Sequence, residues 1–386
     1  MSERLAALRR PGRLAVIALW AVALLIPFFL EAFWLQTGLF AMAAVIGAIG
    51  LTILTGTTGQ LSLAHAFFAA VGAYGYCYFA GQEGAGVSSA TGLNLPPLLA
   101  MVLAVALSGV AGALYSPISG RLRGIYLGIA SIGLVFIGQH ILFNAADLTG
   151  GFNGRDAEPF SLLGFSFTQT DPDLIIAGVK FSELERLWYL GLVLVLIAFY
   201  YGRHLVDGRP GRALETVRDS EVAAAVMGVD VTRYKAAVFT VSSMYAGLSG
   251  VLFALVFNRI VPESFGLNLS VEFLAMIVIG GLGSVRGAVL GAIFVSMLPK
   301  LFDHYSDSLP FLATAGAGGG IEPGQAARFA FGAAIVAVLI FAPGGIGSLW
   351  RGSPGGSAAA ASETTRPPTT QPPARPAPST PKERST

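Results

Sequence analysis

Side chains that could catalyse a reaction or bind a metal are few in this chain and stand far apart. The single cysteine, Cys77, excludes an intrachain disulfide and any multi-cysteine metal site. The four histidines form no H-x-x-x-H pair of the kind that binds zinc from one helix. They are His65, His140, His204 and His304. We therefore expect no metal, no cofactor and no enzymatic activity.

A phosphate-binding loop of the form G-x-x-x-x-G-K-[S/T] does not occur either, because no lysine follows a glycine anywhere in the sequence. The glycine-rich run at residues 316–324, G-A-G-G-G-I-E-P-G, has no expected strand before it and is interpreted as an external loop. If ATP drives this protein, a separate polypeptide must bind and hydrolyse it.

The composition is that of a protein embedded in lipid. Of its 386 residues, 54% are hydrophobic and 12% are charged, against about 25% charged residues in soluble domains. The mean hydropathy is +0.68. The net charge of +2 indicates no nucleic-acid partner, because the basic residues are spread over the loops. The composition predicts an all-α polytopic membrane protein.

One stretch, residues 211–235, is dense in charge between two apolar runs. Eight charged side chains at the centre of a bilayer would cost about 20 kcal/mol in total, so the stretch must lie outside the lipid. The eight are Arg212, Glu215, Arg218, Asp219, Glu221, Asp230, Arg233 and Lys235.

The same stretch carries the signals of a short helix over residues 221–227. Asp219 or Ser220 can cap its N-terminus, with Glu221 in the first turn, and Gly228 can end it in the left-handed conformation. Asp230 or Thr232 can then cap the next, membrane-entering helix. A capped helix at the water surface between two spans favours docking of a soluble partner.

This run, G-R-A-L-E-T-V-R-D-S-E-V-A-A-A-V-M-G-V-D-V-T-R-Y-K-A-A-V-F, resembles the cytoplasmic EAA-type loop of bacterial ABC importer permeases. More narrowly, it is similar to the LivM-type permeases for branched-chain amino acids. The general pattern is E-A-A-x-x-x-G, which puts Val222 at the acidic position, so that Glu221 stands one residue early. An ordinary charged loop with a chance helix is the alternative.

The resemblance implies that this loop couples the permease to ATP-binding subunits. It implies as partners a homologous second permease, two ATP-binding subunits and an external substrate-binding protein, in a bacterial inner membrane. The residues that it assigns to coupling are Gly211, Arg212, Ala213, Arg218, Glu221, Ala223, Ala224 and Gly228.

Apolar segments predict about ten membrane passes, some of them short or broken by glycine. They are residues 14–30, 37–55, 60–80, 94–116, 124–144, 187–203, 236–257, 271–302 and 326–343. The segment 271–302 counts as two passes, because one helix of that length would extend about 48 Å and the hydrocarbon core is about 30 Å thick. A cleaved signal peptide is the alternative for residues 14–30, but the run is long for one.

The distribution of basic residues orients these passes. With both termini in the cytoplasm, 18 of the 24 lysines and arginines lie on the cytoplasmic side, as the positive-inside rule requires. The predicted organisation is a cytoplasmic N-terminus (1–13), a transmembrane permease domain (14–350) and a disordered, proline-rich cytoplasmic tail (351–386). Residues 145–186 form an external loop and residues 204–235 form the coupling loop.

Two membrane segments are interrupted by glycines, G-T-T-G-Q-L-S-L-A-H-A-F-F at 56–68 and I-G-G-L-G-S-V-R-G-A-V-L-G at 279–291. Such breaks either line a substrate path or allow close helix packing. The first resembles the family form G-Q-x-S-L-G-H-A, with Ala64 in place of its second glycine. A lone histidine such as His65 is more often a hydrogen-bonded packing residue than a ligand. The candidate path residues are Gln60, Ser62, His65, Gly281 and Gly283.

The external loop 145–186 contains L-T-G-G-F-N-G-R-D, similar to a T-G-G-x-N-G turn of this permease type, although Phe152 and Arg155 depart from it. It either helps to receive a binding protein or is a solvated loop with glycine turns. The favoured function is the membrane subunit of an ABC importer for branched-chain or related amino acids, with urea, short amides or another small solute as alternatives. An ion-coupled secondary transporter would need acids in mid-span, and an intramembrane enzyme would need a partner for His65.

Overall fold

The computed structural model describes residues 20, 22–82, 91–122, 124–162, 165–167, 174–176, 179–305, 323–341 and 345. These residues belong to one compact unit, Met1–Trp350. The proline-rich tail, the first thirteen residues and residues 14–19 and 21 of the first apolar run fall outside them, as does the glycine-rich run 316–324. Trp20 and residues 22–25 are helical and lead into η1 (Ile26–Phe28).

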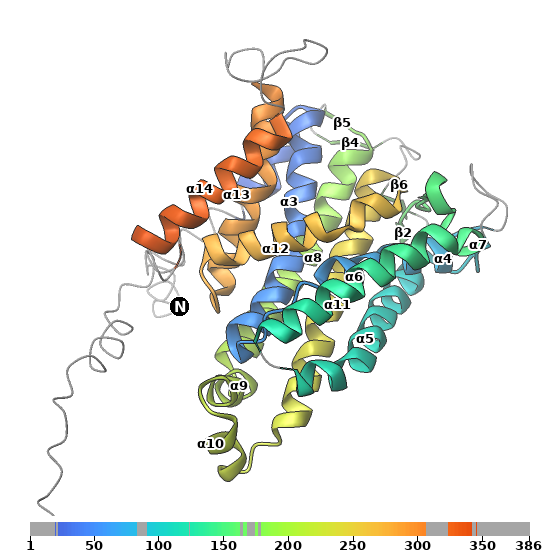
Figure 1. Ribbon diagram of the computed structural model, residues 1–386. Coiled ribbons are helices and arrows are strands. Elements are labelled where there is room, and N and C mark those ends of the chain that lie inside the picture. Colours follow the sequence, from blue (N-terminus) through green and yellow to red (C-terminus); the bar gives the residue numbers. More distant parts are fainter. Residues whose placement is uncertain are drawn as a thin grey trace, which may run out of the picture. The chain divides into compact units, whose positions relative to one another are not determined.

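Helices dominate the described chain (Figure 1). Six of them are long and apolar enough to cross a membrane, by length and composition. They are α3 (Ala32–Leu51) with the π-helical η2 (Thr52–Gly56), α5 (Pro97–Arg121), α6 (Ile125–Asn144), α8 (Glu183–Asp207), α11 (Val231–Phe257) and α13 (Val285–His304). Three shorter helices accompany them, namely α4 (His65–Ala80), α12 (Leu267–Gly280) and α14 (Pro323–Phe341). The count of ten passes and the orientation of the termini stay predictions.

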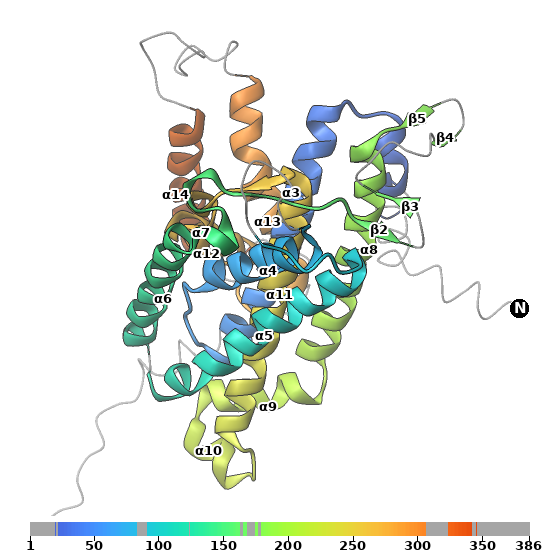
Figure 2. The same ribbon diagram turned by 90° about the vertical axis from the view of Figure 1, so that its right-hand side faces the viewer.

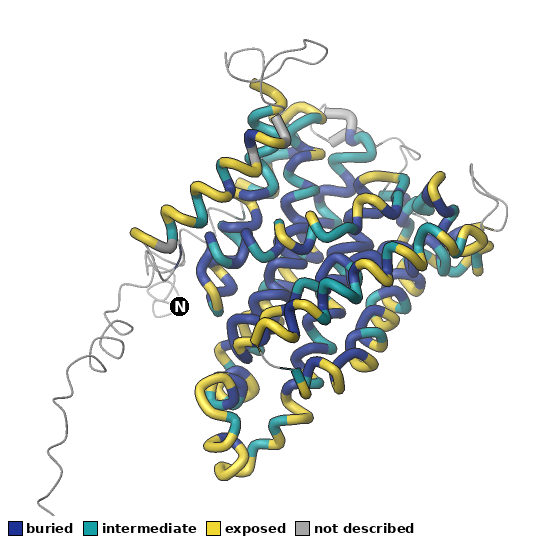
Figure 3. Tube along the Cα trace, in the orientation of Figure 1, coloured by how far each residue is buried: buried dark blue, intermediate teal, exposed yellow. Residues whose placement is uncertain are grey.

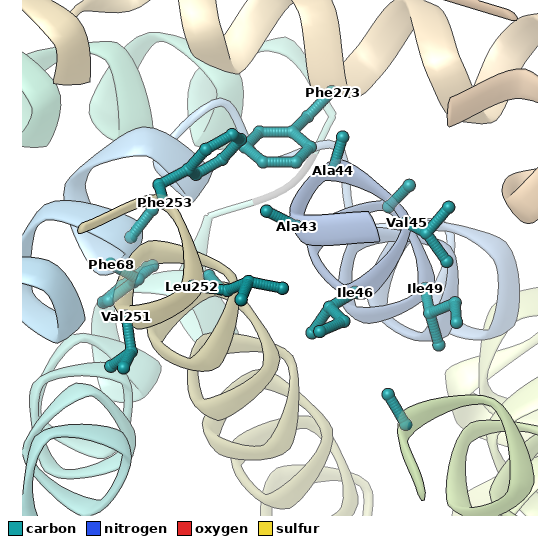
Figure 4. Close-up of a cluster of buried hydrophobic side chains, with 14 of the residues drawn as sticks. Ala43, Ala44, Val45, Ile46, Ile49, Phe68, Val251, Leu252, Phe253 and Phe273 are labelled. Atoms are coloured by element: carbon teal, nitrogen blue, oxygen red, sulfur yellow. The ribbon is translucent and has the colours of Figure 1, made fainter. Parts of the chain in front are cut away.

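The core forms where α3 and α11 pack together. In the apolar stretch of each of these helices, 83% of the residues are buried in α3 with η2 and 72% in α11, against 28% in α6. The central helices are accordingly dark in Figure 3. Figure 4 shows Leu252 of α11 pointing toward Ile46 of α3, and Phe273 of α12 lying beside Phe253 of α11, in this cluster. The outer helices keep broad apolar exposure, as a lipid-facing surface requires.

Small residues bring α4 against α11. A side chain on Gly72 would overlap the carbonyl oxygen of Gly247, so only glycine permits this approach. Ser108 of α5 donates a hydrogen bond to the carbonyl of Phe68 at 3.2 Å. Close contact through glycine and serine is typical of helix packing in membranes.

The connections at one end of the helices contain short strands. The strands form three antiparallel pairs. These are β1 (Arg155–Asp156) with β6 (Arg259–Ile260), β2 (Ser161–Leu162) with β3 (Phe165–Ser166), and β4 (Leu174–Ile176) with β5 (Val179–Phe181). The helical turns α7 (Ala146–Thr149), η3 (Gly151–Asn153) and η4 (Pro262–Phe265) lie in the same connections. The all-α prediction therefore needs a correction for these loops, whose extended segments are too short to show an alternating pattern.

Arg155 ties these connections together. Its side chain is buried and donates to the carbonyl oxygens of Leu148 at 2.6 Å and Thr91 at 2.7 Å. Burial lowers the pKa of its guanidinium. Two further helices, α9 (Arg209–Asp219) and α10 (Glu221–Val226), lie at the opposite end of the helices, as Figures 1 and 2 both show. We call the two ends the strand end and the α9–α10 end.

Candidate functional site

The charged stretch forms two helices at the α9–α10 end, where the sequence predicted one. Sequence reasoning missed α9, because Pro210 near its start and the two glycines on either side of this proline resemble a turn. Gly211, Leu214 and Val217 are its buried residues, three apart in each case. That spacing is the signal of an amphipathic helix that could have revealed α9.

The caps of α10 agree with the sequence prediction and choose between its alternatives. The Ser220 hydroxyl accepts a hydrogen bond from the Ala223 amide at 3.2 Å. At the other end Gly228 has φ +85°, its amide donates to the carbonyl of Ala225, and the Val229 amide donates to the carbonyl of Ala224. This pair of bonds is a Schellman motif, which needs a left-handed residue at the glycine position.

The helix α11 begins at the predicted cap as well. The Asp230 carboxylate accepts a hydrogen bond from the Arg233 amide at 3.1 Å. One face of α10 packs against the protein through the buried Ala224, and the opposite face is exposed to solvent. Three apolar side chains there are between 75% and 84% exposed, and we call them the α10 patch: Val222, Val226 and Met227.

Ion pairs and close contacts fix this pair of helices to the longer ones. Lys235 of α11 donates to the carboxylate of Glu221 at 2.6 Å, and the Lys235 side chain is only 7% exposed. Arg212 donates to the carbonyl of Asp207 at the end of α8, at 3.1 Å. Gly211 is so close to the carbonyl of Val206 that a side chain would overlap it.

Of the remaining predicted coupling residues, one is partly packed against the protein and one is exposed to solvent. Ala213 is half-buried in α9, and Ala223 is exposed beside the α10 patch. A cavity of about 350 Å³ lies at the junction of α5, α10 and α11, and Arg121, Glu221 and Lys235 line it.

Arg218 makes the contact that links this loop to the glycine-broken segments. Its guanidinium donates to the carbonyl oxygen of Gly56, at the end of η2, at 3.0 Å. Its stem packs close to Gly59, the residue with φ +68° where the first helix breaks. Gly56 in turn lies directly against Gly283, because a side chain on Gly56 would overlap the backbone of Gly283. The two predicted breaks therefore touch each other, and α9 touches the first.

The second break is a tight turn between α12 and α13. Gly281 and Gly283 have φ +105° and φ +78°, which side chains rarely adopt. The Ser284 hydroxyl then accepts a hydrogen bond from the Gly287 amide at 3.1 Å and caps α13. The break is thus confined to four residues, 281–284, within the predicted glycine-interrupted segment 279–291.

The polar residues of the first break make hydrogen bonds within the protein. The His65 Nε2 lies 2.8 Å from the carbonyl oxygen of Gly47, and its ring meets Phe273 edge-on. Gln60 lies 3.5 Å from both the carbonyl and the hydroxyl of Ser119. The Ser62 hydroxyl accepts from the Ala64 amide at 3.4 Å.

These contacts favour the packing interpretation for His65, which is buried with a carbonyl partner. Gln60, Ser62 and His65 line neither the 350 Å³ cavity nor a larger cavity at the strand end. Their role on a substrate path stays a prediction.

A family model for the permease component of branched-chain amino acid transport systems matches residues 34–339. The match runs from α3 to α14 and includes both breaks and the α9–α10 end. The chain belongs to this family. The permease is a multi-pass protein of the inner membrane and the membrane-spanning subunit of an ABC importer.

Individual relatives agree with this assignment. The permease is 32% identical over 307 residues to the high-affinity branched-chain amino acid transport permease LivM of Salmonella typhimurium, covering 76% of this chain and 70% of that protein. It is 24% identical over 253 residues to the probable LivM of Methanocaldococcus jannaschii, covering 64% and 67%. It is 24% identical over 261 residues to LivH of Salmonella typhimurium, covering 67% and 81%. No solved structure matches the chain significantly.

Proposed function

We propose that the permease imports branched-chain amino acids together with a homologous second permease, two ATP-binding subunits and an external substrate-binding protein. The observation that carries the mechanism is the hydrogen bond from Arg218 to the carbonyl of Gly56. Through it, a displacement of α9 reaches the first break directly, and the second break through Gly283. ATP-driven movement at the loop would thereby open or close the membrane path beside the breaks.

The docking surface for an ATP-binding subunit is α10 with the exposed part of α9. The α10 patch is apolar and solvent-exposed at an end of the molecule that carries many charges, and this combination is typical of a protein interaction site. The Lys235–Glu221 pair and the Arg212 contact hold the two helices to α11 and α8. A force applied to the patch would therefore be transmitted to the membrane-length helices rather than bending a loose loop.

The proposed topology has ten passes with both termini in the cytoplasm. In its support, basic residues gather at the α9–α10 end, including Arg121 at the end of α5, Arg203 in α8 and Arg218 in α9. This bias is expected for a cytoplasmic face. The proposed domains remain 1–13, 14–350 and 351–386, with 145–186 external and 204–235 as the coupling loop.

An ATP-driven importer and an ion-coupled carrier differ in their energy source. Mid-span acids, which ion-coupled carriers use, do not occur in the described parts of α3, α5, α6 and α11, and Glu272 of α12 lies toward the strand end. The permease itself is proposed to have no enzymatic activity. The external binding protein is proposed to select the solute within the class, whether an amino acid, urea or a short amide, before the solute reaches the permease.

Copurification and uptake test the proposal. The purified permease should hydrolyse no ATP, should copurify with a separate ATP-binding protein, and should support ATP-dependent leucine uptake in reconstituted vesicles. Val226→Asp, which puts a charge into the α10 patch, should weaken the association, whereas Phe152→Asp at the exposed strand end should not. ATP hydrolysis by the permease alone, or leucine uptake driven by an ion gradient without ATP, would contradict the proposal.

A further inference from the structure

A cavity of about 420 Å³ lies at the strand end, bounded by α3, η4, α11, α12, α13 and α14. Its volume is within the range of small-molecule sites, roughly 300–1,000 Å³. An aromatic wall is formed by Phe40 of α3 with Phe253 and Phe257 of α11, and the ring centroids of Phe40 and Phe257 are 4.6 Å apart. This wall suits an aliphatic side chain.

Side chains of both charges line the same cavity. Glu272 comes from α12, Lys300 from α13 and Arg328 from α14. Within the described chain, the Glu272 carboxylate has no salt bridge or hydrogen bond, and the Lys300 ammonium lies 6.0 Å from the centroid of the Phe40 ring. The Arg328 charge stabilises the Glu272 carboxylate electrostatically, but no salt bridge joins these two side chains, so a ligand that carries both charges can bind between them.

The backbone adds a further acceptor. Pro299 stands inside α13 and has no amide hydrogen, so the carbonyl of Val295 lacks the donor that a helix would supply four residues on. Both residues line the cavity. A carbonyl in this position can accept a hydrogen bond from an ammonium group.

We propose that this cavity binds a zwitterionic α-amino acid with a branched aliphatic side chain during its passage. The ligand carboxylate pairs with Lys300 and Arg328. Its ammonium group pairs with Glu272 and the carbonyl of Val295, and its side chain packs on the aromatic wall. This inference rests on the proposed function, because it assumes that branched-chain amino acids are the solutes imported.

The geometry makes the site selective for molecules with both charges. An amine without a carboxylate leaves the two cations unpaired, and a carboxylic acid without an amine leaves Glu272 unpaired; each loses charge-assisted hydrogen bonds. Sequence reasoning counted Lys300 and Arg328 only among the 24 lysines and arginines and assigned no function to this group. The path residues predicted from the sequence lie outside the cavity.

Thiol labelling in the assembled importer tests occupancy directly. We would place a cysteine in the cavity with Ser296→Cys, in a Cys77→Ala background, and measure its rate of reaction with a small thiol reagent. Millimolar L-leucine should slow labelling about tenfold or more, whereas 3-methylbutylamine and 4-methylpentanoate, which each lack one charge, should not. Adding Glu272→Gln should remove the protection by leucine. Glu263→Cys, exposed nearby and outside the cavity lining, is the matched control whose labelling leucine should not change.

Two results would overturn the site. Leucine uptake by the wild-type importer without protection of Ser296→Cys would show that leucine passes elsewhere, although the proposed function would stand. A cysteine at 296 that stays unlabelled in the assembled importer without solute would show that another protein surface covers the cavity. Conversely, protection by leucine in an importer that does not transport it would support the site and contradict the proposed function.

Discussion

The guanidinium of Arg218 and the main-chain carbonyl of Gly56 are joined by a hydrogen bond of 3.0 Å, although the two residues are 162 positions apart. The bond connects α9, outside the membrane-length helices, with the π-helical end of the most buried of them. Since Gly56 also lies against Gly283, one side chain of the coupling loop reaches both broken helices. We expect this contact to transmit ATP-driven movement of α9 to the two broken helices beside the membrane path.

Replacing Arg218 tests that route. Arg218→Met keeps the apolar stem beside Gly59 but removes the donor to Gly56. A hydrogen bond to a charged group contributes about 1.5–3 kcal/mol, so we expect leucine uptake to fall about tenfold or more while ATP hydrolysis continues. Uptake and hydrolysis should be measured on the same vesicles. Arg233→Met is the control, because its side chain is 88% exposed and pairs with Asp230 beside it; equal effects of the two variants would refute a special role for Arg218.

The left-handed conformation of Gly228 predicts a graded response to substitution. A side chain there meets no atom within 4 Å, so any effect arises from the backbone at φ +85°. Gly228→Val should cost about 1–2 kcal/mol and weaken association with the ATP-binding subunit, whereas Gly228→Asn, which tolerates this conformation, should resemble the wild type. Copurification at equal membrane levels measures the difference. If both variants behave alike, the backbone conformation is not what the subunit recognises.

The contact between the two breaks predicts that no side chain fits at Gly56. Gly56→Ala should force Gly283 aside, with an overpacking cost of about 1–3 kcal/mol, and should reduce both thermal stability and uptake. Gly133→Ala in α6 is the matched control, because nothing lies within 4 Å of the added carbon and alanine favours helix. Thermal unfolding in detergent and uptake in vesicles test both variants. A Gly56→Ala protein as stable and active as the control would exclude tight contact between the breaks.

The proposed orientation predicts opposite accessibility of the two ends. In a Cys77→Ala background, a cysteine at the exposed Phe152 should react with a membrane-impermeant thiol reagent in intact cells, and one at the exposed Asp219 should react only after the cells are opened. Labelling of position 219 but not 152 in intact cells would invert the topology.

The sequence alone determined those features that depend on near neighbours along the chain. Helix caps involve residues within about four positions of each other, and for this reason Ser220, Gly228 and Asp230 were predicted where the structure has them. The glycine breaks and the apolar segments are local in the same sense. The helix α9 was missed because the turn-like residues near its start concealed the buried spacing of Gly211, Leu214 and Val217.

Only the tertiary structure decided which of these local features meet. Arg218 and Gly56, Gly56 and Gly283, and His65 and Gly47 come from different parts of the chain, and their contacts depend on how whole helices pack. The cavity with Glu272, Lys300 and Arg328 likewise draws on several helices. Helix packing is set by the fit of complete side-chain surfaces. The spacing of residue types along one segment therefore does not indicate which other helix that segment will pack against.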